Sequence, residues 1–386
     1  MKALVFELRE ARFVAAAAAS RLRPGVGARI GPLKLTEMSE PDLPGDDWVR
    51  VSPTLSGICG SDLSTIDGHS SRYFEPFLTF PFVLGHEVVG TTDDGRRVLI
   101  EPVLGHAAHG AEPPFEGAAQ ADGHDYGHLI GGPIGPGIQI GSCNSTGGGW
   151  SELLVAHRSQ LHDVPEDVDD ASAVIVEPVA AGVHAALKSN VPDGGTVAVL
   201  GAGMMGLAAI AGLREYTEVG TIVVGARYPH QRALAKMAGA DEVVGPDEVA
   251  RALRRMTGCG VLGQRLAGGA DAVIDAVGNS GSVTDAIGMA RPRGRVVMLG
   301  MPAKVTTDLT ALWHRETELV GSYCYGTEHS HGDKHTYELA FDLVRKLDLG
   351  RLLTATYSLE DYVDAIDHAA TAGARGAVRI AFEIGS

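Results

Sequence analysis

The sequence predicts an α/β protein of two domains, one rich in β-strands and one built on a doubly wound parallel sheet. Its 386 residues exceed what one ordinary core accommodates. Short strand-like runs punctuated by Pro and Gly fill the first part of the chain. From residue 196 onward, apolar strand-like runs alternate with helical segments, which is typical of a parallel sheet.

Residues 1–55 are expected to be β-rich, with strands at 2–6 and 48–51, and further strands are expected at 83–91, 96–101 and 150–156. Asp93-Asp94-Gly95 is typical of a hairpin turn. The segment 102–149 is rich in Gly, Pro and His and predicts a long loop lobe, whose length suggests a function or an elaborated surface. A helical region follows at 170–188.

The second part begins with a strand at 196–200 and a helix at 207–213. Further strands are expected at 221–224, 243–244, 272–275, 295–300 and 318–323, with helices at 230–237 and 282–289. The tail predicts helices at 337–347 and 359–370 and a closing strand at 377–383 that packs back on the first domain. The expected domains are therefore 1–185 with 324–386, and 186–323.

Composition excludes several partners. The formal net charge of −16 argues against nucleic acid or an anionic membrane as the main partner. No apolar run reaches about 18 residues, so no membrane span is expected. The four cysteines form no CxxC pair, which makes a reducing cytoplasm the default compartment. A small molecule is the expected partner.

The stretch from Pro81 to Gly90 carries a His-Glu pair, His86 and Glu87, between two apolar runs. Burying such a pair is costly without a partner, and a metal ion would satisfy both side chains. Upstream, Cys59 offers a thiolate in a glycine-flanked turn, and downstream Glu177 offers a carboxylate. Cys, His and Glu together predict an open zinc site with a vacant position for water or substrate.

A glycine-rich motif of the GxGxxG type lies between the predicted strand 196–200 and the helix after it. In this context the glycines permit the turn, the approach of a pyrophosphate and close packing of helix on strand, while the helix start binds phosphates. The residues predicted to bind a dinucleotide here are Gly201, Gly203, Met204, Met205 and Gly206.

The strand after this motif normally ends in an acidic residue that binds the ribose hydroxyls. Here it ends in Gly225, Ala226 and Arg227, with no carboxylate. Small residues followed by an arginine suit a 2′-phosphate, which a guanidinium can bind with two hydrogen bonds. We therefore expect NADP(H) rather than NAD(H); the alternative is that Arg227 only lies over the adenine or faces solvent.

These motifs occur in the order found in the zinc-dependent medium-chain alcohol dehydrogenases. The segments that carry the resemblance are Gly57-Ile58-Cys59-Gly60-Ser61-Asp62, Gly85-His86-Glu87, Glu177-Pro178 and the glycine motif, which together span nearly the whole chain. The sequence most resembles the sorbitol and threonine dehydrogenase-like branch. The resemblance implies a GroES-like catalytic domain, a Rossmann domain, and dimers or tetramers.

The resemblance also implies roles for individual residues. Cys59 and His86 correspond to catalytic zinc ligands, and Glu177 to the third ligand or a residue that holds the zinc-bound water. Glu87 is either a ligand or a supporting residue. Ser61 resembles the hydroxyl that takes the alcohol proton, and Arg379 resembles a basic residue that reaches the cofactor phosphate.

The sequence departs from the family pattern in two places. The lobe from Gly105 to Gly132 lacks the four cysteines of a structural zinc site, so that site is predicted to be absent. The lobe does contain histidines and aspartates that could bind a metal in principle, although a solvated polar loop is the simpler interpretation; they are His106, His109, His124, His128, Asp122 and Asp125. Ser64 stands where many relatives have a proton-relaying histidine, so the proton can leave through Ser64, a ribose hydroxyl or water.

The leading hypothesis is a zinc-dependent oxidoreductase that transfers a hydride between a secondary alcohol or polyol and NADP(H). One alternative keeps the fold without the metal, as a zinc-free NADPH-dependent reductase. A second alternative is a non-catalytic nucleotide-binding protein. The Cys/His/Glu set argues against both.

Overall fold

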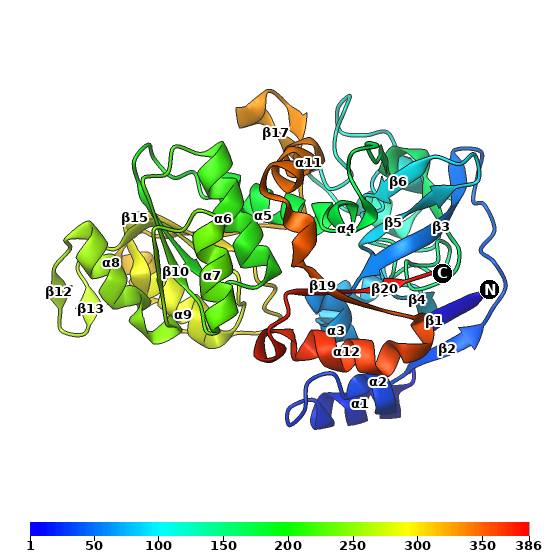
Figure 1. The fold of residues 1–386 in the computed structure, drawn as a ribbon, viewed down its shortest axis with the longest axis horizontal. Helices are drawn as coiled ribbons and strands as arrows, with labels where there is room; N and C mark the ends of the chain where they lie inside the picture. The colour runs from blue at the N-terminus through cyan, green and yellow to red at the C-terminus, as the bar shows by residue number, and fades with distance from the viewer. Residues whose placement is uncertain (386) are drawn as a thin grey trace. The chain divides into compact units, whose positions relative to one another are not determined.

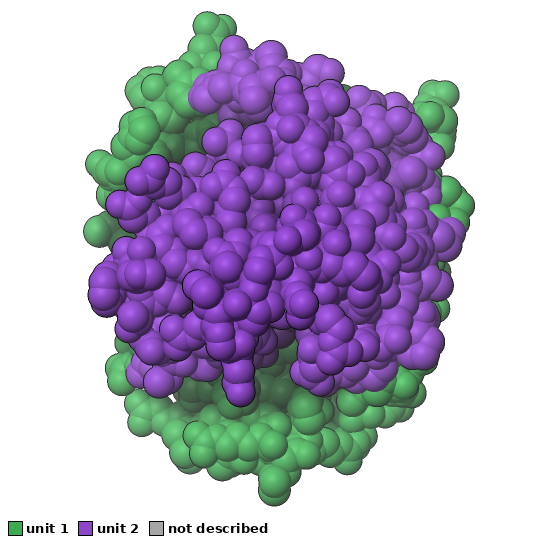
Figure 2. Space-filling view, turned by 90° about the vertical axis from the view of Figure 1, so that its left-hand side faces the viewer, with its two compact units in different colours: residues 1–177, 348–386 green, residues 178–347 purple. Residues whose placement is uncertain are grey.

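The computed structural model describes residues 1–385 of the chain, which form two compact units (Figures 1 and 2). Unit 1 is Met1–Glu177 with Asp348–Ser386, and unit 2 is Pro178–Leu347. The first unit is discontinuous. The two units meet in the sequence at 177/178 and 347/348, whereas the sequence analysis placed the domain boundaries at 185/186 and 323/324.

The boundaries shift because two helices pack within unit 2. Helix α5 (Val176–Lys188) brings Gly182 so close to Ala208 that a Cβ there would lie 2.3 Å from the alanine Cβ. Helix α11 (Thr336–Leu347) accepts a 2.7 Å hydrogen bond from the Tyr216 hydroxyl at the carbonyl of Leu339. Neither contact is visible in local sequence patterns.

Unit 1 contains a seven-stranded sheet in the order β19-β20-β3-β5-β6-β8, with β7 paired to β3. All pairs are antiparallel except β19 with β20. The strands are β3 (Trp48–Gly57), β5 (Val88–Thr92), β6 (Arg97–Ile100), β7 (Leu154–His157), β8 (Leu161–Asp163), β19 (Leu353–Tyr357) and β20 (Arg379–Glu383). A smaller antiparallel sheet has the order β2-β1-β4, from β2 (Leu33–Glu37), β1 (Lys2–Phe6) and β4 (Phe82–Val83).

The N-terminal segment is not purely β-rich, and the prediction is wrong there. Residues between β1 and β2 form α1 (Glu10–Ala19) and α2 (Gly27–Ile30), beside α3 (Gly60–Ile66) and α12 (Tyr362–Ala370) (Figure 1). Alanine has the highest helix propensity, which favours a helix over the run that ends α1. The buried Asp67 carboxylate then accepts hydrogen bonds from the amides of Gly25 (2.7 Å) and Gly27 (3.0 Å) and ties the segment to the end of α3.

The predicted strand 83–91 is interrupted, so His86 and Glu87 lie in a loop between β4 and β5. Gly85 adopts φ +91°, a left-handed conformation that ends the strand, and a Cβ there would lie 2.2 Å from Trp150 Cδ1. Trp150 is fully buried and donates to the Gly57 carbonyl at 3.2 Å. The indole thus fixes both the loop and the end of β3.

The lobe 102–149 is mostly irregular, as predicted, with short 3-10 turns at Ala107–His109 and Gly127–Ile130. The His106 and His128 rings stack with centroids 3.8 Å apart. The buried His109 ring lies 2.8 Å from the Gly131 carbonyl through Nδ1 and 3.0 Å from the Gly137 carbonyl through Nε2. Because both nitrogens of His109 face carbonyls, this side chain packs the lobe instead of presenting a free metal ligand.

Unit 2 has the predicted doubly wound sheet, six parallel strands in the order β11-β10-β9-β14-β15-β16. The strands are β9 (Thr196–Leu200), β10 (Thr221–Gly225), β11 (Glu242–Val244), β14 (Ala270–Asp275), β15 (Ala290–Met298) and β16 (Glu318–Gly321). The further helices are α6 (Met204–Tyr216), α7 (Pro229–Met237), α8 (Val249–Thr257), α9 (Ser280–Met289) and α10 (Thr310–His314). Two small hairpins, β12 (Val261–Leu262) with β13 (Arg265–Leu266) and β17 (Thr327–Glu328) with β18 (Lys334–His335), complete the unit.

One segment of the described chain, Asp170–Lys188, is long and apolar enough by composition to cross a membrane. It comprises α4 (Asp170–Ala173) and the whole of α5, and 72% of its most apolar window is buried inside the protein. Such burial is typical of a core helix.

Candidate metal and dinucleotide sites

Cys59 is placed by the junction of β3 and α3. It occupies the N-cap position of α3 in extended conformation, with φ −85° and ψ 158°. Its backbone amide donates to Asp62 Oδ2 at 2.9 Å, so the third helical residue reaches back to the cap. The thiol is thereby held at a helix N-terminus, where a thiolate is favoured.

His86 lies in the loop that Gly85 and Trp150 hold, and its side chain is buried. Its Nδ1 lies 3.3 Å from Asp62 Oδ1, and its Nε2 lies 3.5 Å from the Ser61 hydroxyl. A carboxylate at Nδ1 orients the ring and leaves Nε2 available, as is usual for histidines that bind metals. Asp62 therefore supports both Cys59 and His86, a role that the sequence analysis did not assign.

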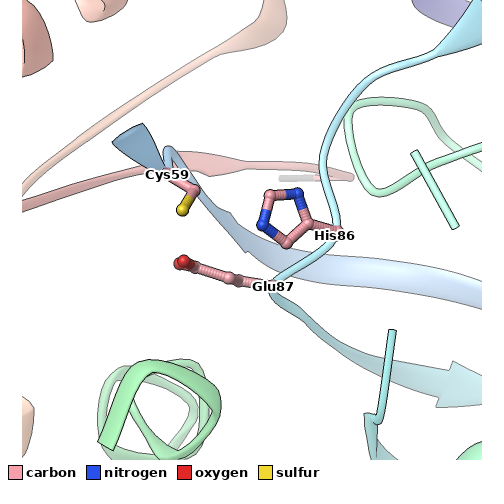
Figure 3. A group of neighbouring side chains, drawn as sticks. All are labelled: Cys59, His86 and Glu87. Atoms are coloured by element: carbon pink, nitrogen blue, oxygen red, sulfur yellow. The ribbon is translucent and has the colours of Figure 1, made fainter. Parts of the chain in front are cut away.

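Cys59, His86 and Glu87 form a group whose potential ligand atoms all lie within 4.8 Å of one another. Figure 3 shows the three side chains turned toward one another from the start of α3 and from the loop before β5. A sulfur, a nitrogen and a carboxylate oxygen at this spacing suit a zinc ion.

Arg379 lies at the start of β20 and is buried beside this group. Its guanidinium forms an ion pair with the Glu87 carboxylate. The family resemblance implies a contact of Arg379 with the cofactor phosphate and gives no indication of this pair. Pairing compensates the charge of Glu87, which would otherwise be costly to bury.

Glu177 lies in the first turn of α5 and is 8% exposed, but it is not part of the group of three. Burial raises its pKa to about 8; the charge of His86 opposes the rise, and the charges of Cys59 and Asp62 add to it. Within residues 1–385 no hydrogen bond or ion pair engages its carboxylate. A buried carboxyl without a partner is a suitable oxygen ligand for a cation.

The electrostatics of unit 1 also fit a metal. Burial alone raises the pKa of the Cys59 thiol, but the hydrogen bond and charge of His86, with the charge of Arg379, outweigh burial and lower that pKa to about 6. The thiolate is the form that binds metal. The Cys59 thiolate and the carboxylates of Asp62 and Glu87 outnumber the two cationic groups beside them, His86 and Arg379, so a divalent cation fits the donor set.

Replacing Asp62 with alanine is expected to weaken zinc binding by about 10- to 100-fold, because supporting carboxylates contribute that much to metal affinity. The matched control is Asp67→Ala, which removes a buried carboxylate with two amide hydrogen bonds from the other end of α3. Zinc dissociation constants from competition with a chromogenic chelator measure the effect. Equal affinities in the two variants would contradict the role of Asp62.

The glycine motif in unit 2 has the geometry expected of a dinucleotide-binding turn. Gly201 follows β9 with φ +94°, and Gly203 is the N-cap of α6. A Cβ at Gly206 would lie 2.0 Å from the Gly201 carbonyl oxygen, so only glycine lets helix and turn pack this closely. Met204 and Met205 form the first turn of α6, whose free amides can bind phosphate.

Ala226 and Arg227 follow β10, at the same edge of the sheet as the glycine turn. Ala226 is buried and donates its amide to Val244 at 2.9 Å, which fixes the backbone there. Arg227 is exposed, and no carboxylate in the described part of the chain pairs with it. Its guanidinium is therefore available to a ligand.

Two family models match the chain. "Alcohol dehydrogenase GroES-like domain" matches residues 45–166, and "Zinc-binding dehydrogenase" matches residues 205–346. The protein described as "Probable D-xylulose reductase A" of Arthroderma otae is 30% identical over 355 residues, 88% of this chain and 91% of that protein. The chain belongs to the zinc-dependent medium-chain alcohol dehydrogenases.

Within this family the chain is similar to the sorbitol dehydrogenase-like branch. A sorbitol dehydrogenase of Bacillus subtilis is 26% identical over 350 residues, 87% of this chain and 90% of that enzyme. The dehydrogenase described here is thus an oxidoreductase with the GroES-like and Rossmann domains that the sequence predicted.

Solved structures confirm the fold. An alcohol dehydrogenase from Escherichia coli in complex with NADH superposes with a TM-score of 0.70 at 22% identity, covering 100% of this chain and 99% of that one. A structure from Sinorhizobium meliloti with bound NADP gives 0.68 at 23% identity, covering 92% and 97%.

Proposed function

We propose that this dehydrogenase transfers a hydride between a secondary alcohol or polyol and NADP(H) at a zinc site in unit 1. The observation that carries the proposal is the group of Cys59, His86 and Glu87, with the last two buried, Cys59 partly buried, and all three ligand atoms within 4.8 Å of one another. The names of the relatives, a sorbitol dehydrogenase and a xylulose reductase, support a polyol or the matching ketone as the substrate class.

We assign the zinc ligands to Cys59, His86 and Glu177. Glu87 already has a cationic partner in Arg379, whereas the Glu177 carboxyl has none among the described residues and a raised pKa. When bound, zinc supplies a Lewis acid that polarises the alcohol oxygen and lowers the pKa of its proton. The ion pair of Glu87 and Arg379 then lies beside the zinc ligands without binding the metal.

Ser61 is the group proposed to take the alcohol proton. Its hydroxyl lies 3.5 Å from His86 Nε2, the nitrogen assigned to the metal, so it borders the place where the substrate oxygen would be held. A hydroxyl can donate and accept at once, which is what a proton carrier requires. Ser61 thus lies within reach of the reacting oxygen without being a ligand.

The proposed cofactor is NADP(H). The exposed, unpaired guanidinium of Arg227 and the absence of an acid after β10 support a 2′-phosphate. Solved structures of this fold bind either NADH or NADP, so the fold itself does not decide. The choice rests on the residues after β10.

A substrate screen tests the proposed function. Polyols and secondary alcohols are offered with NADP⁺, and formation of NADPH is followed by its absorbance, with and without a zinc chelator. The expected result is turnover that the chelator removes and added zinc restores. Turnover insensitive to the chelator would indicate a zinc-free reductase, and absence of turnover despite bound zinc and NADPH would indicate a nucleotide-binding protein without catalysis.

We propose that the chain is a homodimer paired through the edge of the sheet in unit 2. β16 is the terminal strand of that sheet, and apolar side chains beside it are exposed: Leu319 by 38%, Trp313 by 68% and Leu309 by 49%. Exposed edge strands with apolar side chains are sites of pairing. A second copy offers an identical edge, as a two-fold axis requires.

The variant Leu319→Lys with Trp313→Glu is expected to halve the mass in solution, because it places charges on the proposed contact. Light scattering coupled to gel filtration measures the mass. Leu262→Lys, at the 72% exposed position on β12, is the control and should leave the mass unchanged. A monomeric parent protein, or a variant of unchanged mass, would contradict this interface.

We also propose a cytoplasmic location, since Cys59, Cys143 and Cys259 are free thiols and the sequence has no CxxC pair, as expected in a reducing compartment.

A further inference from the structure

Asp275 is the last residue of β14, at the carboxyl edge of the sheet in unit 2. β14 lies next to β9, and the chain leaves these two strands in opposite directions across the sheet. In open α/β sheets, ligands bind outside the carboxyl ends of the strands where the strand order reverses in this way. Asp275 therefore stands at the position in unit 2 where a dinucleotide is expected.

The Asp275 side chain is 1% exposed, and every hydrogen bond that the structure gives it holds the turn that follows β14. Oδ1 accepts from the amides of Val277 (2.9 Å) and Gly278 (3.1 Å). Oδ2 accepts from the Ser282 hydroxyl (2.9 Å) in the first turn of α9. One carboxylate thus fixes both the turn and the start of the helix after it.

The main-chain carbonyl of Asp275 also binds the residues that follow the neighbouring strand β15. Its carbonyl accepts from the amides of Leu299 (3.0 Å) and Gly300 (2.7 Å), which follow β15. The two turns meet backbone to backbone, since a Cβ at Gly278 would lie 2.8 Å from the Gly300 carbonyl carbon. The ends of β14 and β15 are therefore one rigid assembly.

This assembly packs directly on the glycine turn after β9. The Ala276 amide donates to the Leu200 carbonyl at 3.0 Å, and a Cβ at Gly201 would lie 2.8 Å from Val277 Cγ2. Val277 is nevertheless 48% exposed. A side chain that touches the phosphate-binding turn and remains exposed is available to a bound ligand.

We infer that Asp275 is a positioning residue for the dinucleotide, because it holds Val277 and the turn 276–279 against the glycine motif before the ligand arrives. The inference rests on the proposed binding of NADP(H) to unit 2. Its physical basis is preorganisation: a turn that is already fixed costs no ordering free energy when the cofactor binds. Without the carboxylate, the turn must be ordered by the cofactor itself.

The test is the dissociation constant for NADPH, from quenching of protein fluorescence, together with the unfolding temperature with and without NADPH. Asp275→Ala is expected to raise the constant by about tenfold or more, since three hydrogen bonds to a charged acceptor are lost. Asp275→Asn retains an oxygen for the two backbone amides and is expected to stay close to the parent protein.

Asp271→Ala is the matched control. Asp271 lies on the same strand near the opposite edge of the sheet, where it accepts from the Thr196 amide (2.8 Å) and from Arg291 (2.6 Å). Both alanine variants should unfold at a lower temperature, but only Asp275→Ala should lose cofactor affinity and the shift that NADPH gives to its unfolding temperature.

The outcomes separate the inference from the function on which it rests. If Asp275→Ala binds NADPH as the parent does, or if both alanine variants lose affinity equally, Asp275 has only a structural role. If the parent protein itself binds neither NADPH nor NADH, the proposed function fails instead.

Discussion

Replacing Cys59 with alanine is expected to remove zinc from the protein and to lower kcat by about 10³-fold or more. Cys59 is the one sulfur in the group, and its loss leaves His86 and the carboxylates with an incomplete donor set. The Lewis acid supplies several kcal/mol of transition-state stabilisation, and each 1.4 kcal/mol corresponds to about tenfold in rate. Zinc content by mass spectrometry and kcat with the best substrate of the screen measure both effects.

Two controls separate this effect from misfolding. Cys259→Ala changes a partly buried cysteine of unit 2, far along the chain from the ligands, and should keep zinc and activity. The Cys59→Ala protein should still bind NADPH with the parent's affinity, because the glycine turn and Arg227 belong to unit 2. A Cys59→Ala protein that keeps full activity would refute the Lewis-acid role.

Replacing Arg227 with alanine is expected to lower kcat/KM for NADP⁺ by about 100-fold while changing the value for NAD⁺ by less than about threefold. A guanidinium that binds the 2′-phosphate makes charge-assisted hydrogen bonds, and losing them costs on the order of 1.5–3 kcal/mol each. NAD⁺ has no such phosphate, so it loses nothing. The ratio of the two kcat/KM values is the measurement.

Arg227 is exposed and unpaired among the described residues, so the substitution should leave the unfolding temperature unchanged. Arg232→Ala, in the helix α7 that follows β10, is the matched control. The Arg232 Nε donates to the Ala226 carbonyl at 3.0 Å and so supports the backbone next to Arg227. That variant should affect both cofactors alike. A parent protein that uses NAD⁺ and NADP⁺ equally well would contradict the proposed binding of the 2′-phosphate by Arg227.

The two-domain architecture could be predicted from the sequence because strong local patterns, the apolar strand-like runs and the glycine motif, indicate it. The apolar strands and the glycine motif of unit 2 lie where expected, and the structure adds their order in the sheet and two helices that were not predicted, α8 and α10. The first unit was less predictable. The segment that leads into α2 is held by Asp67, which lies about forty residues further along the chain and accepts hydrogen bonds from the amides of Gly25 and Gly27. A pattern read over a few neighbouring residues cannot reveal a contact between residues so far apart in the sequence.

The candidate site, too, could be predicted from the sequence only in part. Cys59 and His86 stand in recognisable motifs, and the structure brings them together with Glu87. The roles of Asp62 and Arg379 required three-dimensional contacts: Asp62 binds the cap of its own helix and a histidine from another loop, and Arg379 reaches Glu87 from the last strand. Only the spacing of Asp62, three residues after Cys59 at a helix start, was a usable signal.

The central claim is that one zinc ion is held in unit 1 by Cys59, His86 and Glu177. A crystal structure of the zinc-loaded protein, with anomalous difference maps recorded on both sides of the zinc absorption edge, tests it most directly. The predicted result is a single strong peak per chain bonded to the Cys59 sulfur, the His86 Nε2 and the Glu177 carboxylate, with Glu87 still paired to Arg379. A map with no peak at Cys59, or with the zinc bound elsewhere in the chain, would contradict the account.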